Sequence, residues 1–67
     1  MRKMDNVEKH PTKRGYYIGY DGAGYAWRIR RMFSTWYAHP VHQCDMAAIY
    51  APRLWILAKQ LKEVNNG

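Results

Sequence analysis

Two runs that alternate between apolar and polar positions flank a glycine-rich stretch in the first half of the chain. The runs cover residues 15–20 and 25–31, and the stretch between them reads Asp21-Gly22-Ala23-Gly24. Alternation at every second position is typical of strands that bury one face, and Asp-Gly between two such runs indicates a hairpin. We therefore predict a β-hairpin whose loop has either four residues, 21–24, or two, Asp21-Gly22.

The same alternation predicts which side chains share a face of this hairpin. The face expected to be buried carries Tyr16, Ile18, Tyr20, Tyr25, Trp27 and Ile29. The opposite face carries Tyr17, Gly19, Ala26, Arg28 and Arg30. Both loop lengths keep these faces, because the side-chain period of a strand is two. With the four-residue loop, Tyr17 is expected opposite Arg28.

A third alternating run follows, Thr35-Trp36-Tyr37-Ala38-His39, after a turn at residues 32–34. It predicts a third strand. One of several registers pairs Arg31 with Trp36, and therefore Arg30 with Tyr37 and Arg28 with His39. That register would extend the arginine-bearing face over three strands.

The end of the chain predicts a helix. Apolar residues recur there at the spacing of one helical face, at Leu54, Leu57, Ala58, Leu61 and Val64. Pro52 suits the first turn of this helix, since that position has no intrahelical N–H bond to lose. The stretch before it leaves two alternatives open. Asp45 could cap a short helical segment, or residues 47–51 could form a fourth strand.

These elements predict a small α+β domain over residues 15–67, in the order β-β-β-α. Its three-stranded antiparallel sheet would carry the C-terminal helix on its apolar face. Residues 1–14 show no clean period and contain Pro11, which favours a flexible basic arm. Over residues 15–65 this outline is similar to the arm-type DNA-binding domains of tyrosine recombinases. The resemblance is one of topology, without a shared motif, and implies DNA binding by analogy alone.

Composition and charge narrow the class of partner. The 67 residues carry a net charge of +6, of which residues 1–31 hold +5. A basic pole on an aromatic-rich domain favours an anionic partner, with nucleic acid first and an acidic or nucleoprotein surface second. A chain this short buries a modest share of its surface, so either a homo-oligomer or a bound partner would add stability. The single cysteine, the lack of a membrane-length apolar run and the lack of a secretory signal favour the cytoplasm and no membrane partner.

Six residues are candidates for binding nucleic acid. Arginines neutralise phosphates and exposed rings stack on bases, so the predicted outer face supplies both kinds of contact. The basic arm would add phosphate contacts that carry no sequence information. The candidate site residues are Tyr17, Arg28, Arg30 and Tyr37 on the sheet, with Lys13 and Arg14 from the arm.

The sequence contains few residues in patterns that indicate catalysis or metal binding. His39, His42 and Cys44 form one cluster without a second, separated pair of ligands, so we expect no metal site. The five acidic residues are scattered, and the phosphate-binding loop motif of nucleotide hydrolases is absent. We expect no enzyme and no cofactor.

Two functions remain. The leading hypothesis is a non-catalytic nucleic-acid-binding accessory protein. The alternative is a small inhibitor, of the kind that viruses and mobile elements use against host defence complexes, which occludes a nucleoprotein complex through protein contacts.

Overall fold

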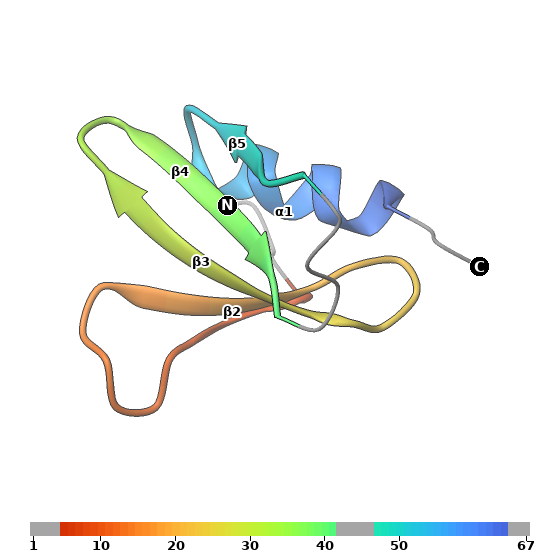
Figure 1. Ribbon diagram of the computed structural model, residues 1–67, viewed down its shortest axis with the longest axis horizontal. Coiled ribbons are helices and arrows are strands. Elements are labelled where there is room, and N and C mark those ends of the chain that lie inside the picture. The colour runs from red at the N-terminus through yellow and green to blue at the C-terminus, as the bar shows by residue number, and fades with distance from the viewer. Residues whose placement is uncertain (1–4, 42–46, 65–67) are drawn as a thin grey trace.

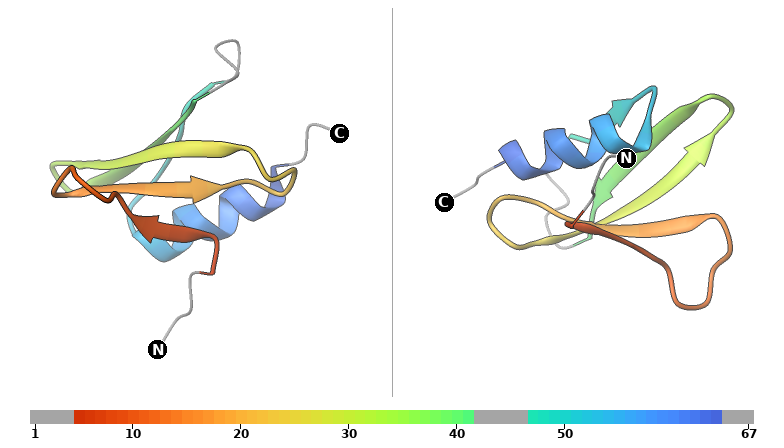
Figure 2. Two further views of the ribbon diagram at one scale, coloured as in Figure 1. Left: turned by 90° about the horizontal axis from the view of Figure 1, so that it is seen from below. Right: turned by 180° about the vertical axis from the view of Figure 1, so that it is seen from behind.

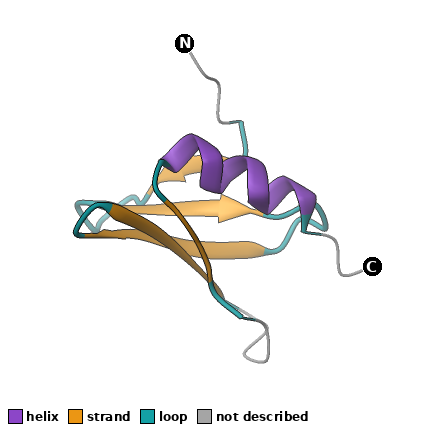
Figure 3. Cartoon of the chain, turned by 90° about the horizontal axis from the view of Figure 1, so that it is seen from above, coloured by secondary structure: helices purple, strands orange, loops and turns teal. Residues whose placement is uncertain are grey.

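Five strands and one helix make up the computed structural model, which describes residues 5–41 and 47–64 (Figure 1). Their bounds are β1 Val7–Lys9, β2 Tyr16–Tyr20, β3 Ala26–Met32, β4 Thr35–Pro40, β5 Ile49–Ala51 and α1 Leu54–Glu63. The strands form one antiparallel sheet in chain order, and α1 lies across one face of it (Figure 3). The α+β class and the C-terminal helix on the sheet are confirmed. The prediction of three strands is wrong, because the sheet has five.

The two additional strands are short edge strands of three residues each. β1 lies within the segment predicted to be a flexible arm, and pairs Val7 with Gly19 and Lys9 with Tyr17 of β2. The Asn6 side chain ties this strand down, since its Nδ2 donates to the carbonyls of Tyr20 and Ala58, each over 3.0 Å. β5 decides the open alternative for residues 47–51 in favour of a strand over residues 49–51. Asp45, the cap of the helical alternative, lies outside the described residues.

The register of the β2–β3 hairpin differs from the prediction by one residue. Tyr20 pairs with Ala26, so the loop holds five residues, 21–25, rather than four or two. The shift turns every β2 side chain to the other face relative to β3. Gly19 and Tyr17 therefore share a face with the core residues Trp27 and Ile29, while Tyr16 and Ile18 share the opposite face with Arg30 and Arg28.

Asp21 organises this longer loop. Its Oδ1 accepts the N–H groups of Ala23 and Tyr25, each over 2.9 Å, and its Oδ2 accepts the indole N–H of Trp27 over 2.9 Å. Gly24 completes the loop with a φ of +89°, a conformation that favours glycine. The carboxylate thus satisfies two backbone donors of the loop and the indole N–H of Trp27.

The core lies between the sheet and α1. The buried cluster comprises Trp27, Ile29, Ala38, Ala51, Leu57 and Leu61. Gly19 permits close packing, because a Cβ there would lie 2.7 Å from side-chain carbons of both Ile29 and Leu61. The helix prediction is confirmed over residues 54–63, and the predicted core positions Trp27 and Ile29 are buried.

The helix covers one face of the sheet only, as the two views of Figure 2 show. We call the face away from α1 the outer face. It carries alternate residues of each strand, in register with Arg28 and Arg30 of β3. In the described part of the chain, no helix is long and apolar enough to span a bilayer.

Candidate nucleic-acid interface

Side chains on the outer face stand in two adjacent rows that cross the strands. In the first row Tyr16 lies opposite Arg30, Arg30 opposite Tyr37, and Tyr37 opposite Tyr50. The second row runs through Glu8, Ile18, Arg28 and His39. Directly opposed residues of antiparallel strands have Cβ atoms about 5 Å apart, so each row is a continuous strip of side chains. The rows place three tyrosines and two arginines on one open surface.

Of the several β3–β4 registers that the sequence left open, the structure has the one that extends the arginine-bearing face. Arg31 pairs with Trp36, Arg30 with Tyr37 and Arg28 with His39. A turn of two residues after Met32 sets this register, since Met32 pairs with Thr35. Arg30 and Tyr37 are therefore neighbours on the outer face, as the sequence pattern indicates.

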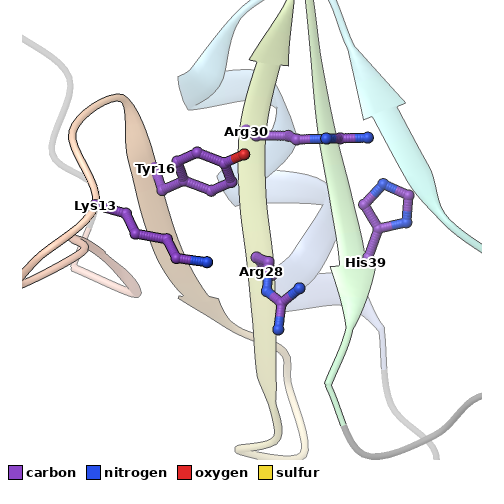
Figure 4. A pocket seen from close by; sticks show the side chains of 5 residues that line it. All are labelled: Lys13, Tyr16, Arg28, Arg30 and His39. Carbon is purple, nitrogen blue, oxygen red and sulfur yellow. The ribbon is translucent and has the colours of Figure 1, made fainter.

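A hollow of about 360 Å³ lies between the rows. Its lining comprises Lys13, Tyr16, Arg28, Arg30 and His39 (Figure 4). Lys13 extends from the loop before β2 toward Arg28, and Arg30 extends across toward β4 (Figure 4). The volume falls within the range of small-ligand sites, which is large enough for a nucleotide unit.

The charge of this hollow is unbalanced. Among the described residues that line it none is acidic, while Lys13, Arg28 and Arg30 are cationic and exposed. The one described carboxylate on the outer face, Glu8, accepts a hydrogen bond from the Tyr20 hydroxyl over 3.3 Å. Adjacent cations repel one another, so an anion bound between them would relieve that repulsion.

The loop that carries Lys13 is held by a histidine. Nδ1 of His10 accepts the backbone N–H groups of Thr12 and Lys13, over 3.2 Å and 3.0 Å. The chain then turns back into β2 at Gly15, which has a φ of +83°. Lys13 Nζ lies 5.6 Å from the centre of the Tyr16 ring, within the range of a cation–π contact. His10 thus positions a lysine beside the first tyrosine of the row.

Of the six predicted site residues, the outer face brings four together. Lys13, Arg28 and Arg30 line the hollow, and Tyr37 lies opposite Arg30 in the first row. Arg14 lies beside them in a second, smaller hollow of about 190 Å³, which shares Lys13 and Tyr16 with the first.

The placement of Tyr17 on the arginine-bearing face is wrong. Tyr17 is on the face that α1 covers, where its ring packs edge-on against Trp36 with 5.6 Å between ring centres. The five-residue loop is the physical reason, since it shifts β2 by one position against β3. Tyr16 takes the place beside the arginines that the sequence pattern assigned to Tyr17.

Sequence reasoning missed three aromatic members of the outer face, which are Tyr16, Tyr20 and Tyr50. Tyr16 and Tyr20 were assigned to the core because the loop length was misjudged. Tyr50 lies in a stretch that the sequence left open between helix and strand, and the strand over residues 49–51 places it on the outer face. Its side chain is 68% exposed, and its ring centre lies 6.1 Å from that of Tyr37. The alternation Ile49-Tyr50-Ala51 is the signal that could have found it.

The histidine and cysteine cluster considered from the sequence is only partly described. His39 lines the hollow, while His42 and Cys44 lie outside the described residues. Across residues 5–41 and 47–64, no three His, Cys, Asp or Glu side chains come together in a way that could hold a metal ion.

The arrangement on the outer face can stack flat rings and neutralise anions, and it offers these two contacts side by side. Comparison of the chain with known protein families, with characterised proteins and with solved structures finds no significant match.

Proposed function

We propose that the protein binds single-stranded nucleic acid on the outer face of its sheet, without catalysing a reaction. The observation that carries the proposal is the row Tyr16, Arg30, Tyr37 and Tyr50, with Arg28 and His39 beside it. The row places one guanidinium group between tyrosine rings, so bases can stack on the rings while a phosphate is neutralised beside them.

The rings of the row favour single strands over duplexes. A base in a duplex is already stacked on its neighbours, whereas an unpaired base can stack on a tyrosine, which contributes about 1–3 kcal/mol per base. Tyr50 is the most exposed ring of the row and lies at the edge of the sheet, beside Tyr37. Tyr16 lies at the other end of the row, with Lys13 over its ring. A strand laid along the row meets a ring at both ends.

The cations of the hollow supply the electrostatic part of the affinity. Each phosphate neutralised by Arg28, Arg30 or Lys13 would release counterions, so affinity falls with salt by a log–log slope of about −0.7 per phosphate on single strands. Contact by all three cations gives an expected slope near −2. A protein interface without such cations would respond far less to salt.

Fluorescence anisotropy with a labelled single-stranded oligonucleotide at two salt concentrations tests the proposal. Arg28→Ala and Arg30→Ala should each weaken binding by about 1 kcal/mol or more and reduce the salt slope. Lys59→Ala is the matched control, because Lys59 is exposed on α1, on the far side of the sheet. It removes the same charge and should change affinity only slightly.

Two results would contradict the proposal. One is a loss of affinity in Lys59→Ala equal to that in the two arginine variants, which would indicate attraction by net charge alone. The other is a folded wild-type protein that binds no oligonucleotide at low salt. The inhibitor hypothesis, in which the partner is a protein, would then lead.

A further inference from the structure

The turn between β3 and β4 exposes a phenylalanine in an unfavourable backbone conformation. Phe33 has a φ of +57° and its side chain is 94% exposed. Because Met32 pairs with Thr35, Phe33 and Ser34 alone form the turn. The turn lies at the margin of the molecule, away from the middle of the sheet (Figure 1).

Phe33 does not serve the fold. Positive φ costs a residue with a side chain about 1–2 kcal/mol, and turns of this length favour Gly or Asn for that reason. The exposed phenyl ring recovers none of this cost through burial. Strain of this kind that persists in a structure is a sign of function at the strained position.

The surroundings of Phe33 indicate an anionic partner with a flat apolar surface. Nε of Arg31 donates to the Phe33 carbonyl over 3.0 Å, which holds the turn in place. Met32 is 41% exposed and stands on the outer face, because it alternates along β3 with Arg28 and Arg30. Residues 26–40 contain no acidic residue at all. The β3–β4 hairpin therefore ends in two exposed apolar residues, Met32 and Phe33, next to the cationic residues Arg28 and Arg30 of β3.

Nucleic acid offers such a surface where a duplex ends. The last base pair of a duplex exposes its flat face, while the strand that continues beyond it is single and anionic. A single strand held on the row crosses β3 at Arg30, two residues before Met32, so a duplex that adjoins it can bring its last base pair to the β3–β4 turn, next to Phe33 and Met32.

We propose that Phe33 stacks on the terminal base pair at a junction between duplex and single strand, with the single strand held on the outer face. This inference rests on the proposed function, and it assigns a role to a residue that the proposed function leaves unused. Phenylalanine and other apolar side chains contact the faces of bases where DNA-bending proteins insert them between base steps.

The experiment compares a DNA hairpin that carries a single-stranded overhang with the overhang strand alone. A 2-aminopurine in the terminal base pair reports stacking through quenching of its fluorescence. Wild-type protein should bind the junction about fivefold or more tightly than the strand alone and should quench the probe. Phe33→Gly should abolish the preference and the quenching, keep the affinity for the strand alone, and melt at the same or a higher temperature because the strain is relieved.

Two further variants sharpen the comparison. Phe33→Tyr keeps a ring and should keep the junction preference. Tyr25→Ala is the matched control, because Tyr25 is an exposed aromatic residue in the loop at the opposite end of β3. It should leave the junction preference unchanged.

The outcomes separate the two proposals. Wild-type binding to single strands without any junction preference, or a preference that survives Phe33→Gly, would overturn the role of Phe33 and leave the proposed function standing. A protein pocket would then be the remaining partner for the ring. A lower melting temperature of Phe33→Gly would overturn the argument that the ring does not serve the fold. Absence of binding to both ligands would overturn the proposed function itself.

Discussion

Trp27 donates a hydrogen bond from its indole Nε1 to Oδ2 of Asp21, over 2.9 Å. Both residues are buried, with 1% and 7% of their surface exposed. The bond joins the largest side chain of the core to the residue that organises the β2–β3 loop. Because that loop sets the register of β2 against β3, the same bond helps to decide that Tyr16 and not Tyr17 stands beside the arginines.

Asp21→Asn should destabilise the protein. The amide keeps one acceptor oxygen, whereas the carboxylate accepts three N–H donors that would otherwise be unsatisfied. We expect the free energy of unfolding to fall by about 2–3 kcal/mol, measured by urea denaturation. Asp5→Asn is the control, since Asp5 pairs with Lys62 at the surface and its loss should matter little. Equal effects of the two substitutions would refute the role of Asp21.

Stability should depend on pH through the same carboxyl. Burial raises the pKa of Asp21, but the hydrogen bonds from Trp27, Tyr25 and Ala23 outweigh it, so its pKa lies below the ordinary value. The charged form is therefore favoured in the folded state. Its contribution is present above the unfolded pKa of about 3.9 and is lost as the pH falls through the folded pKa.

Thermal melts of wild type and Asp21→Asn across this acid range check the pH dependence. The difference in melting temperature should be constant near neutral pH and shrink as the pH falls below about 4. A melting-temperature difference between wild type and Asp21→Asn that stays unchanged into strong acid would contradict the role of the Asp21 carboxylate.

Gly22→Ala should loosen the contact between the hairpin loop and the helix. The Gly22 N–H donates to the carbonyls of Leu61 and Val64, over 3.1 Å and 2.8 Å, at the end of α1. A Cβ at Gly22 would lie 2.6 Å from the Lys62 carbonyl oxygen and 2.7 Å from that of Val64. Backbone atoms cannot move aside as a flexible side chain can, so we expect a loss of about 2–3 kcal/mol in a urea melt.

Gly24→Ala is the comparison within the same loop. Its Cβ would meet nothing within 4 Å, and only the φ of +89° opposes the substitution. The expected loss is about 1 kcal/mol. A larger loss for Gly24→Ala than for Gly22→Ala would show that the contact with α1 contributes little.

Tyr16→Ala and Tyr17→Ala should have opposite effects, although the residues are neighbours. Tyr17 packs on the core side against Trp36, so its truncation should cost about 2 kcal/mol or more of stability and leave oligonucleotide affinity of the folded protein intact. Tyr16 stands on the outer face, so its truncation should weaken binding and spare stability. Urea melts measure the stability of both variants, and fluorescence anisotropy measures their affinity for an oligonucleotide. A loss of stability in Tyr16→Ala and a loss of affinity in Tyr17→Ala would support the register predicted from the sequence instead.

The sequence pattern predicted the parts of the fold that local alternation and periodicity determine. Strand β3 with its buried Trp27 and Ile29, strand β4 and the helix all follow from side-chain period. Arg28, Arg30 and Tyr37 were placed correctly on the outer face for the same reason.

The β2–β3 loop length and the two edge strands depend instead on contacts between residues that local alternation does not reveal. The loop length depends on a carboxylate that bonds to a side chain across the hairpin, which no turn pattern encodes. β1 and β5 have three residues each, too few for a period, and β1 is secured by Asn6 through the carbonyl of Ala58 in the helix. Tyr16 was missed as a site residue because the face on which it lies depends on the length of the β2–β3 loop. Tyr50 was missed because its place on the outer face depends on the pairing of β5 with β4.

The central claim is that the outer face is the nucleic-acid interface. The most direct test is a titration of the ¹⁵N-labelled protein with an oligonucleotide of about eight unpaired nucleotides, followed by amide chemical shifts at low salt. We predict that the shift changes concentrate at Tyr16, Arg28, Arg30, Tyr37 and Tyr50 and spare residues 54–63 of α1. Shift changes centred on α1, or none at all, would contradict the claim.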